Sequence, residues 1–192
     1  KCIFLPVERL VESVEHVVGA GGKVTKLLLP SLVISGWSGR AEECDGGREN
    51  RLLVPMTLDH LDRVMAIENA SHVRPWTRGN FSDSLASGYL AEVLFDADGA
   101  LVGYCVAAAA GDEMHLLNLS VAPGCRRRGH ASCLLRALIA RCRTEGVAQL
   151  WLEVRVSNED ARRLYRQFGL QEVGLRPRYY PAQAGRAGAR AE

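Results

Sequence analysis

The order of hydrophobic patterns between residues 89 and 175 constrains the fold more than any other feature. Two alternating apolar segments that meet at Asp98-Gly99 predict a hairpin of two strands, and residues 114–121 predict a third. There follow a helical pattern from about Ala131 to Thr144, a strand at 149–156, a helix opened by Asn158 and a strand near 170–175. Strands that first form a hairpin and then alternate with helices predict an α/β fold with a mixed sheet.

Upstream of this region the pattern changes twice. Residues 51–57 predict a short strand, Thr57 caps an amphipathic helix through Ile67, and residues 77–85 predict a second short helix. Before residue 51 the composition differs, because all three lysines lie in the first 26 residues and the rest of the chain uses arginine only. Residues 38–50 are polar and typical of a linker. We therefore predict an appended segment of unknown role at 1–50 and one domain at 51–192.

Composition excludes several classes of protein. A hydrophobic content of 47% and a net charge of +2 indicate a globular protein without an overall basic surface. The charge is uneven, with fourteen arginines against six acidic residues from Arg126 onward, which favours a local anionic ligand. The six cysteines form no CxxC pair, so we expect no metal site and reduced thiols in a cytoplasmic protein. No apolar run is long enough to span a membrane, and we expect no membrane among the partners of this chain.

The sequence "NLSVAPGCRRRGHASCLLRALIARC", from Asn118 to Cys142, places three arginines where a strand passes into a helix. The first amides of a helix lack internal partners and, with the helix dipole, attract an anion. Gly129 and Ala131 leave the backbone open to close approach, so the turn suits a diphosphate. The alternative is a solvated basic loop before an ordinary helix.

The order of these residues resembles a known motif. "RRRGHA" fits Q/R-x-x-G-x-G/A, the turn with which GCN5-related N-acetyltransferases (the GNAT family) bind the pyrophosphate of coenzyme A, between a strand and a helix. "LWLEVRVSN", "LYRQFGL" and "YYP" resemble one branch of that family, the ribosomal-protein-alanine N-acetyltransferases called RimI. The resemblance covers about residues 52–185. It implies the GNAT fold, a mixed and mostly antiparallel sheet flanked by helices, with coenzyme A at the strand-to-helix turn.

The resemblance also implies roles for individual residues. Glu153 is expected to be the general base that deprotonates the amine, and Tyr165 the general acid that protonates the coenzyme thiolate. A strand bulge and the pyrophosphate turn are expected to bind acetyl-CoA, and Asn158 lies on the pantetheine arm. The expected cofactor-binding residues are Leu119, Ser120, Val121, Arg127, Arg128, Gly129, His130, Ala131, Ser132 and Asn158. By the same resemblance the acceptor is the amino-terminal peptide of a ribosomal protein, acetylated on its α-amine.

Residue patterns alone leave alternatives open. Glu153 by itself is typical of a surface residue, and Tyr165 shares a helical stripe with Leu164 and Phe168 that is typical of a core. The same fold acting on a lysine or a small-molecule amine is the nearest rival, and an arginine-rich nucleic-acid-binding module is the rival of another class. Because three arginines are bunched at one turn, we expect no direct nucleic-acid partner. The carboxyl terminus "GRAGARAE" has no strand pattern, so we expect the family's final strand to be missing.

Overall fold

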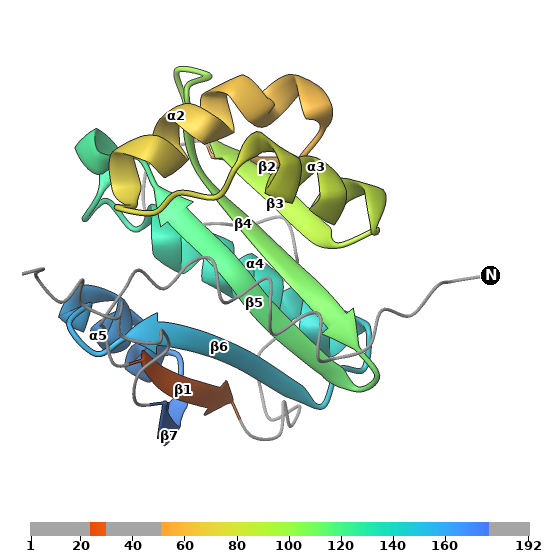
Figure 1. Ribbon diagram of the computed structural model, residues 1–192, viewed down its shortest axis with the longest axis vertical. Coiled ribbons are helices and arrows are strands. Elements are labelled where there is room, and N and C mark those ends of the chain that lie inside the picture. Colours follow the sequence, from red (N-terminus) through yellow and green to blue (C-terminus); the bar gives the residue numbers. More distant parts are fainter. Residues whose placement is uncertain (1–23, 30–50, 177–192) are drawn as a thin grey trace, which may run out of the picture.

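The fold is built on one seven-stranded sheet (Figure 1). The computed structural model describes residues 24–29 and 51–176. The strands lie in the order β2-β3-β4-β5-β6-β1-β7. Their bounds are β1 Val24–Leu29, β2 Leu52–Pro55, β3 Leu90–Phe95, β4 Leu101–Ala110, β5 Glu113–Val121, β6 Gln149–Arg155 and β7 Gln171–Arg176. β5 and β6 run parallel and the other neighbouring pairs antiparallel, which confirms the predicted mixed, mostly antiparallel sheet.

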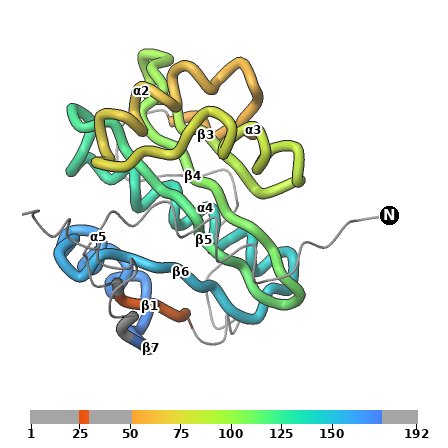
Figure 2. Tube along the Cα trace, in the orientation of Figure 1, coloured from red at the N-terminus to blue at the C-terminus, as the bar shows by residue number. Residues whose placement is uncertain are grey.

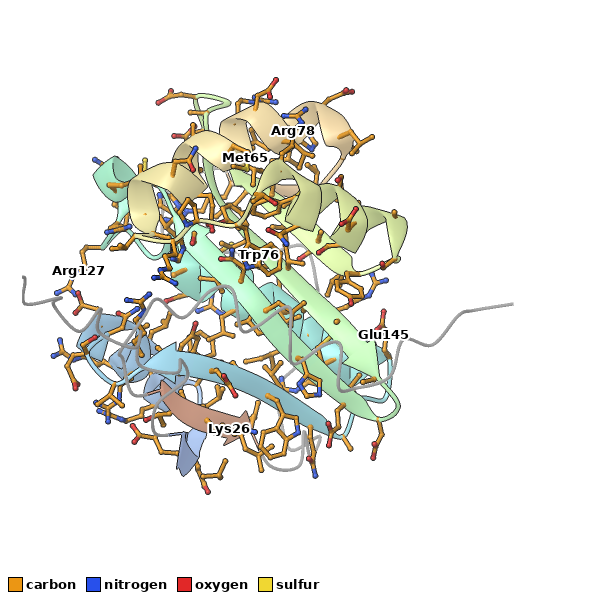
Figure 3. All side chains as sticks on the ribbon, viewed as in Figure 1. Lys26, Met65, Trp76, Arg78, Arg127 and Glu145 are labelled. Atoms are coloured by element: carbon orange, nitrogen blue, oxygen red, sulfur yellow. The ribbon has the colours of Figure 1, made fainter. Side chains whose placement is uncertain are left out.

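Helices cover both faces of the sheet (Figure 1). α2 (Leu61–Ser71) and α3 (Arg78–Ala86) lie on one face, and α4 (His130–Thr144) and α5 (Glu159–Gln167) on the other; the 3-10 turns η1 (Leu58–His60) and η2 (Pro123–Cys125) precede α2 and α4. Two apolar cores result. One holds Trp76, Phe81 and Tyr104 under α2 and α3, and Figure 3 shows Trp76 between these helices and the sheet. The other holds the apolar face of α4 together with β6 and Tyr165 of α5.

The start of α5 confirms the predicted cap at Asn158, whereas Thr57 caps the 3-10 turn η1 and His60 is the N-cap of α2. Asn158 Oδ1 accepts a hydrogen bond from Ala161 N at 3.2 Å and opens α5. Thr57 precedes η1, and its backbone N–H donates to His60 Nδ1 at 3.0 Å. α2 then continues to Ser71, beyond the predicted end at Ile67.

The amino-terminal segment contributes a strand to the sheet. β1 lies between β6 and β7 (Figure 2). It is antiparallel to both, with Lys26 opposite Glu153 and Leu27 opposite Leu152. Leu27 is fully buried in the core below α4 and α5, and Thr25 is also buried. Because side chains alternate along a strand, Lys26 points to the opposite face. The prediction that residues 1–50 stand apart from the domain is therefore wrong for residues 24–29.

The edge of β6 is covered, although the sequence led us to expect that a final strand would be missing. Between β6 and β7 the sheet contains β1, a strand from the other end of the chain. β1 thus covers the edge of β6 that faces away from β5. The segment "GRAGARAE" and the tyrosines of "RPRYYP" lie outside the described residues.

Three of the cysteines are free thiols, as expected from the sequence. They are Cys105, Cys125 and Cys142, and two of them are buried. Burial raises the pKa of Cys142 to about 11 and that of Cys105 further, so these two thiols are unreactive at neutral pH. No helix in residues 24–29 and 51–176 is long and apolar enough to cross a membrane.

Gly103 allows β4 and β5 to approach closely beside the turn that precedes α4. A Cβ built on Gly103 would lie 2.9 Å from the carbonyl oxygen of Ser120 and 3.2 Å from Leu134 Cδ1. We expect Gly103→Ala to lower the free energy of unfolding by about 1–3 kcal/mol, because the backbone of β5 must move. Chemical denaturation measures this change. Gly174→Ala is the matched control, since nothing lies within 4 Å of its Cβ position; equal stability losses in both variants would contradict the close approach.

Candidate active site

A cleft opens where β5 and β6 separate. The two strands pair in parallel only from Glu113–Gln149 to Leu116–Leu152, and beyond this point residues of both strands line an open cavity of about 700 Å³. This volume is ordinary for a small-molecule site. The end of α2, the turn before α4, and α5 form the remaining walls. The unpaired strand edges can offer backbone N–H and C=O groups to an extended ligand.

The turn between β5 and α4 forms one end of this cleft. Gly129 caps α4 with a positive φ of 82°, and Arg127 has a φ of 65°, which is uncommon for a residue with a side chain. The hydrogen bond that closes the first turn of α4 runs from the amide N–H of Cys133 to the carbonyl oxygen of Gly129, at 3.0 Å. The amides of His130, Ala131 and Ser132 therefore point out of the helix end toward the cleft, as an anion site requires.

Positive charge concentrates around the cleft. Its walls carry four arginines, Arg126, Arg127, Arg155 and Arg163, and two acidic residues, Glu153 and Asp160. Arg127 Nη1 lies 2.6 Å from Asp160 Oδ1, which joins the turn to the start of α5; Figure 3 shows Arg127 at the edge of the molecule next to α5. Both side chains are about 70% exposed, so the pair contributes little to stability and an entering phosphate can compete for Arg127.

Glu153 lies in the wall of the cleft contributed by β6. Its neighbours Leu152 and Val154 are buried in the core, and alternation turns Glu153 to the other face. Its side chain is 13% exposed, and Oε1 lies 3.9 Å from Lys26 Nζ on β1; Figure 3 shows where Lys26 lies on that strand. A largely enclosed carboxylate that faces the cleft has the position needed for a general base.

Tyr165 faces the same cleft from α5. It is buried, and burial raises its pKa to about 12. A phenol with this pKa stays protonated at neutral pH, so it can donate a hydrogen bond to a departing thiolate and supply the proton that the sulfur needs. Asn158, the cap of α5, also lines the cleft.

The structure brings the predicted site residues together with one exception. Arg128 is outside the cleft wall, and its carbonyl oxygen accepts a 2.7 Å hydrogen bond from Arg51 Nη2. The other predicted residues line one cavity: Leu119, Ser120, Val121, Arg127, Gly129, His130, Ala131, Ser132, Glu153, Asn158 and Tyr165. This shared location agrees with the predicted roles. The roles of the individual residues stay predictions.

The irregularity in β5 lies earlier than predicted. Ala107 pairs with Leu116 and Val106 with Asn118, so Leu117 is the extra residue of a bulge, two residues before Leu119. Leu116, Leu117 and Asn118 are all buried, which breaks the alternation of a regular strand. The consecutive leucines in "HLLNLS" are the sequence signal for this bulge.

Sequence reasoning missed three other contributions. His72 and Ser71 at the end of α2 line the cleft. Arg51 contacts the turn of residues 126–129 before α4, which we call the anion turn. Its guanidinium donates to Arg128 O and lies 3.7 Å from the position of a Cβ built on Gly129. Lys26 approaches Glu153 from β1. Each comes from a segment distant in sequence from the residues it contacts, so no local motif indicates it.

A divergent pair of parallel strands, a helix end suited to an anion, and a carboxylate and a phenol in one cleft agree with the site expected from the GNAT resemblance. Residues 61–170 match the model of the acetyltransferase (GNAT) family, and the chain belongs to that family.

Curated relatives narrow the comparison. The chain is 35% identical to the ribosomal protein bS18-alanine N-acetyltransferase of Haemophilus ducreyi over 124 residues, 65% of this chain and 85% of that protein. It is 37% identical to the enzyme of that name from Escherichia coli K12 over 120 residues, 62% of this chain and 80% of the relative. The crystal structure of the Escherichia coli ribosomal-protein-S18-alanine N-acetyltransferase matches with a TM-score of 0.65 at 33% identity, over 71% of this chain and 88% of that chain.

Ala131→Glu tests the anion turn. We expect the affinity for acetyl-CoA to fall at least tenfold, because a carboxylate at the second residue of α4 occupies and repels the diphosphate position. The fold should persist, since an acidic residue in the first turn suits the helix dipole. Calorimetry measures the affinity and thermal unfolding checks the fold. A folded Ala131→Glu protein with unchanged affinity would remove this turn from the binding site.

Proposed function

We propose that this chain transfers the acetyl group of acetyl-CoA to the α-amine of an amino-terminal alanine on a small-subunit ribosomal protein. The observation that carries the proposal is the convergence of Glu153, Tyr165 and the anion turn on one cleft. The names of the relatives support the acceptor, because each names the alanine of ribosomal protein bS18.

The residues of the cleft fit acetyl-CoA. The amides at the start of α4, with Arg127 beside them, suit the diphosphate, and the unpaired edges of β5 and β6 suit the amide-bearing pantetheine arm. The thioester supplies an activated acyl group. With these contacts made, its carbonyl carbon would lie within the cleft that Glu153 and Tyr165 face.

Direct transfer needs proton movements at two atoms. The amine nitrogen forms a bond to the acetyl carbon and loses a proton to Glu153, and the C–S bond then breaks as Tyr165 protonates the departing sulfur. The raised pKa of Tyr165 keeps the phenol protonated until a thiolate forms. Cys125 lines the cleft as a free thiol, but this direct route does not use it as a nucleophile.

The pKa of the acceptor favours an α-amine. An α-amine titrates at about 7.7–8.0 and a lysine side chain at about 10.4, so near pH 7 roughly a tenth of the former and under a thousandth of the latter is neutral. A carboxylate base therefore removes a proton more easily from an amino terminus than from a lysine side chain. This comparison disfavours lysine without selecting a peptide sequence.

The arrangement of arginines disfavours the nucleic-acid-binding alternative. Arg162 and Arg166 of α5 both pair with Glu172, and Arg141 of α4 pairs with Glu145. Binding to a nucleic-acid backbone needs free cations spread over one face, whereas these side chains are neutralised locally. Titration of the chain with coenzyme A and with RNA tests the difference, and saturable binding of coenzyme A alone is the expected result.

A peptide panel tests the acceptor. We expect the highest kcat/KM for a peptide that begins with alanine and copies the amino terminus of the small-subunit ribosomal protein. Lower values are expected for the same peptide blocked at its α-amine, for internal lysines and for a polyamine. A faster reaction with lysine or a polyamine would overturn the acceptor and leave the acetyl-transfer site intact.

Tyr165→Phe tests the proton donor. The phenol is expected to contribute through the departing thiolate, so kcat should fall by about tenfold to a hundredfold while the affinity for acetyl-CoA changes little. Steady-state kinetics and calorimetry separate the two effects. A wild-type kcat in the folded variant would show that another group or water protonates the sulfur.

A further inference from the structure

A buried carboxylate lies behind the wall of the cleft. Glu68 of α2 has no exposed surface, and its Oε1 accepts a hydrogen bond from Trp76 N at 2.7 Å. Its Oε2 accepts from the hydroxyl of Tyr104 and from Asn118 Nδ2, the latter at 3.3 Å. Burial of a carboxylate is costly unless donors surround it, so a carboxylate kept here needs an explanation beyond packing.

The imidazole of His72 connects this carboxylate to the cleft. His72 caps the end of α2 and lines the cavity, with its side chain 26% exposed. Nε2 lies 2.7 Å from Ser120 Oγ and 3.4 Å from Glu68 Oε2. Ser120 belongs to the part of β5 that lines the same cavity.

The network assigns the proton on the ring. Ser120 Oγ donates to Asn118 Oδ1 at 3.4 Å, so this hydroxyl has its lone pairs left for His72. Both neighbours of Nε2, Ser120 Oγ and Glu68 Oε2, then act as acceptors, which places the ring hydrogen on Nε2. A neutral imidazole with its hydrogen on Nε2 has its acceptor lone pair on Nδ1. Carboxylate and imidazole thus form a pair in which the carboxylate stabilises a proton gained at Nδ1.

The surroundings keep this histidine neutral until it receives a proton. Burial lowers the pKa of His72 below its usual 6.5; Glu68 opposes this shift, and the positive charges of Arg155 on β6 and Arg126 in the anion turn add to it. The strands β4 and β5, which pack against this end of α2, add the uncharged polar groups Tyr104, Asn118 and Ser120. A lowered pKa means that the basic form persists below pH 6.5, so His72 is a free base at pH 7.

We propose that His72, supported by Glu68, is a further catalytic residue, which accepts the first proton from the α-ammonium group of the acceptor. This inference rests on the proposed function, because it concerns the amine that enters the same cleft. An incoming amino terminus is mostly protonated near pH 7, and two protons must leave its nitrogen before the amide is complete.

The assignment balances the reaction. The ammonium N–H bond breaks and its proton passes to His72, which leaves a neutral amine. The amine nitrogen bonds to the acetyl carbon, Glu153 takes the second proton, and the C–S bond breaks while Tyr165 protonates the sulfur. One of the two protons therefore replaces the proton that Tyr165 gives, and the other leaves to solvent when His72 returns to its neutral form.

His72→Gln in the full chain tests the proposal. A glutamine amide can keep the hydrogen bond to Ser120 but cannot accept a proton. The expected kcat/KM for an alanine peptide falls about tenfold at pH 7, the factor set by the neutral fraction of the α-amine, more at pH 6, and less than about twofold at pH 9, where the amine is already neutral. His115→Gln is the matched control, because His115 on β5 is also 26% exposed and paired with a glutamate, at 3.0 Å, but lies outside the cleft wall. It should match the wild type at every pH.

Two results would overturn the role of His72. An unchanged kcat/KM at pH 6–7 excludes it, and an equal loss at all pH values reduces it to a structural part of the cleft. Proton NMR of the wild-type chain gives a test that needs no variant. In the complex with coenzyme A and the peptide at pH 7, the His72 ring should be neutral with its hydrogen on Nε2, so that Nδ1 can accept a proton. A ring that is already protonated at pH 7, or that carries its hydrogen on Nδ1, contradicts the proposal.

The outcome is distinguishable from failure of the proposed acceptor. If the wild-type chain acetylates another amine faster than the peptide, the acceptor is wrong. The pH series of His72→Gln is then repeated with that amine. The pH at which the loss disappears should follow the pKa of the new amine, and a loss that stays at the same pH would overturn the role of His72 independently.

Discussion

Replacement of Glu153 by glutamine is expected to lower kcat for an amino-terminal peptide by about a hundredfold or more at pH 7, the usual contribution of a positioned general base. Glutamine has the same shape but cannot accept the amine proton. The loss should shrink above pH 8, where hydroxide can replace the carboxylate as the proton acceptor. The affinity for acetyl-CoA should change little, because the proposed diphosphate site is the turn before α4 and not β6.

Glu113→Gln is the control for this measurement. Glu113 is also a strand glutamate paired with a basic side chain, His115 at 3.0 Å, but it lies outside the cleft. Its kcat should equal that of the wild type. A Glu153→Gln protein with normal kcat at pH 7 would show that another group, or water alone, receives the proton.

Deletion of residues 1–29 is expected to abolish the cooperative fold. β1 pairs with six residues of β6 and with β7, and its removal takes the fully buried Leu27 out of the core. Within the described residues β7 has β1 as its strand neighbour, so the deletion also frees β7. Domains are stable by only about 5–15 kcal/mol, and a buried leucine alone contributes about 2–3 kcal/mol. The loss of a strand paired on both sides therefore exceeds what the domain tolerates.

Thermal unfolding followed by circular dichroism measures this effect. Deletion of residues 1–22, which leaves β1 in place, is the control and should retain a cooperative transition. Leu27→Asp in the full chain should reproduce most of the instability. If the chain without residues 1–29 unfolds cooperatively at the wild-type temperature and binds acetyl-CoA, β1 is dispensable and the domain begins near residue 51 as the sequence predicted.

Local patterns predicted most of the fold. The hairpin at Asp98-Gly99, the amphipathic α4 and the cap at Asn158 each depend on neighbouring residues, and the structure confirms all three. Alternation along a strand predicted the face on which Glu153 lies, and the resemblance to the GNAT family predicted that this face borders the site. The anion turn could be placed because helix ends expose amides wherever a helix begins.

The choice of strand partners could not be predicted in this way. "VTKLLL" has an acceptable strand pattern, with Thr25 and Leu27 alternating to the buried face, but its partner β6 lies more than 120 residues away in sequence. The pairing depends on which sheet edge the other strands leave open, and this is a property of the whole sheet. The change from lysine to arginine usage therefore indicated a domain boundary near residue 51, whereas β1 belongs to the same sheet as the strands after it.

The missed parts of the cleft have the same origin. The bulge at Leu117 is a relation between β4 and β5 rather than a property of β5 alone. His72 is a polar residue at the end of a helix, and its significance depends on Ser120 and on the buried Glu68. Contacts across such separations appear only when the sheet is assembled.

The most direct test of the proposed activity is to locate the acetyl group. The purified chain is incubated with acetyl-CoA and a peptide that begins with alanine and also contains an internal lysine, and the product is sequenced by tandem mass spectrometry. We predict a mass increase on the amino-terminal alanine α-nitrogen alone, with no such product from the Glu153→Gln variant at pH 7 over the same time. Acetylation of the lysine in preference to the amino terminus, or no transfer to either nitrogen, would contradict the central claim.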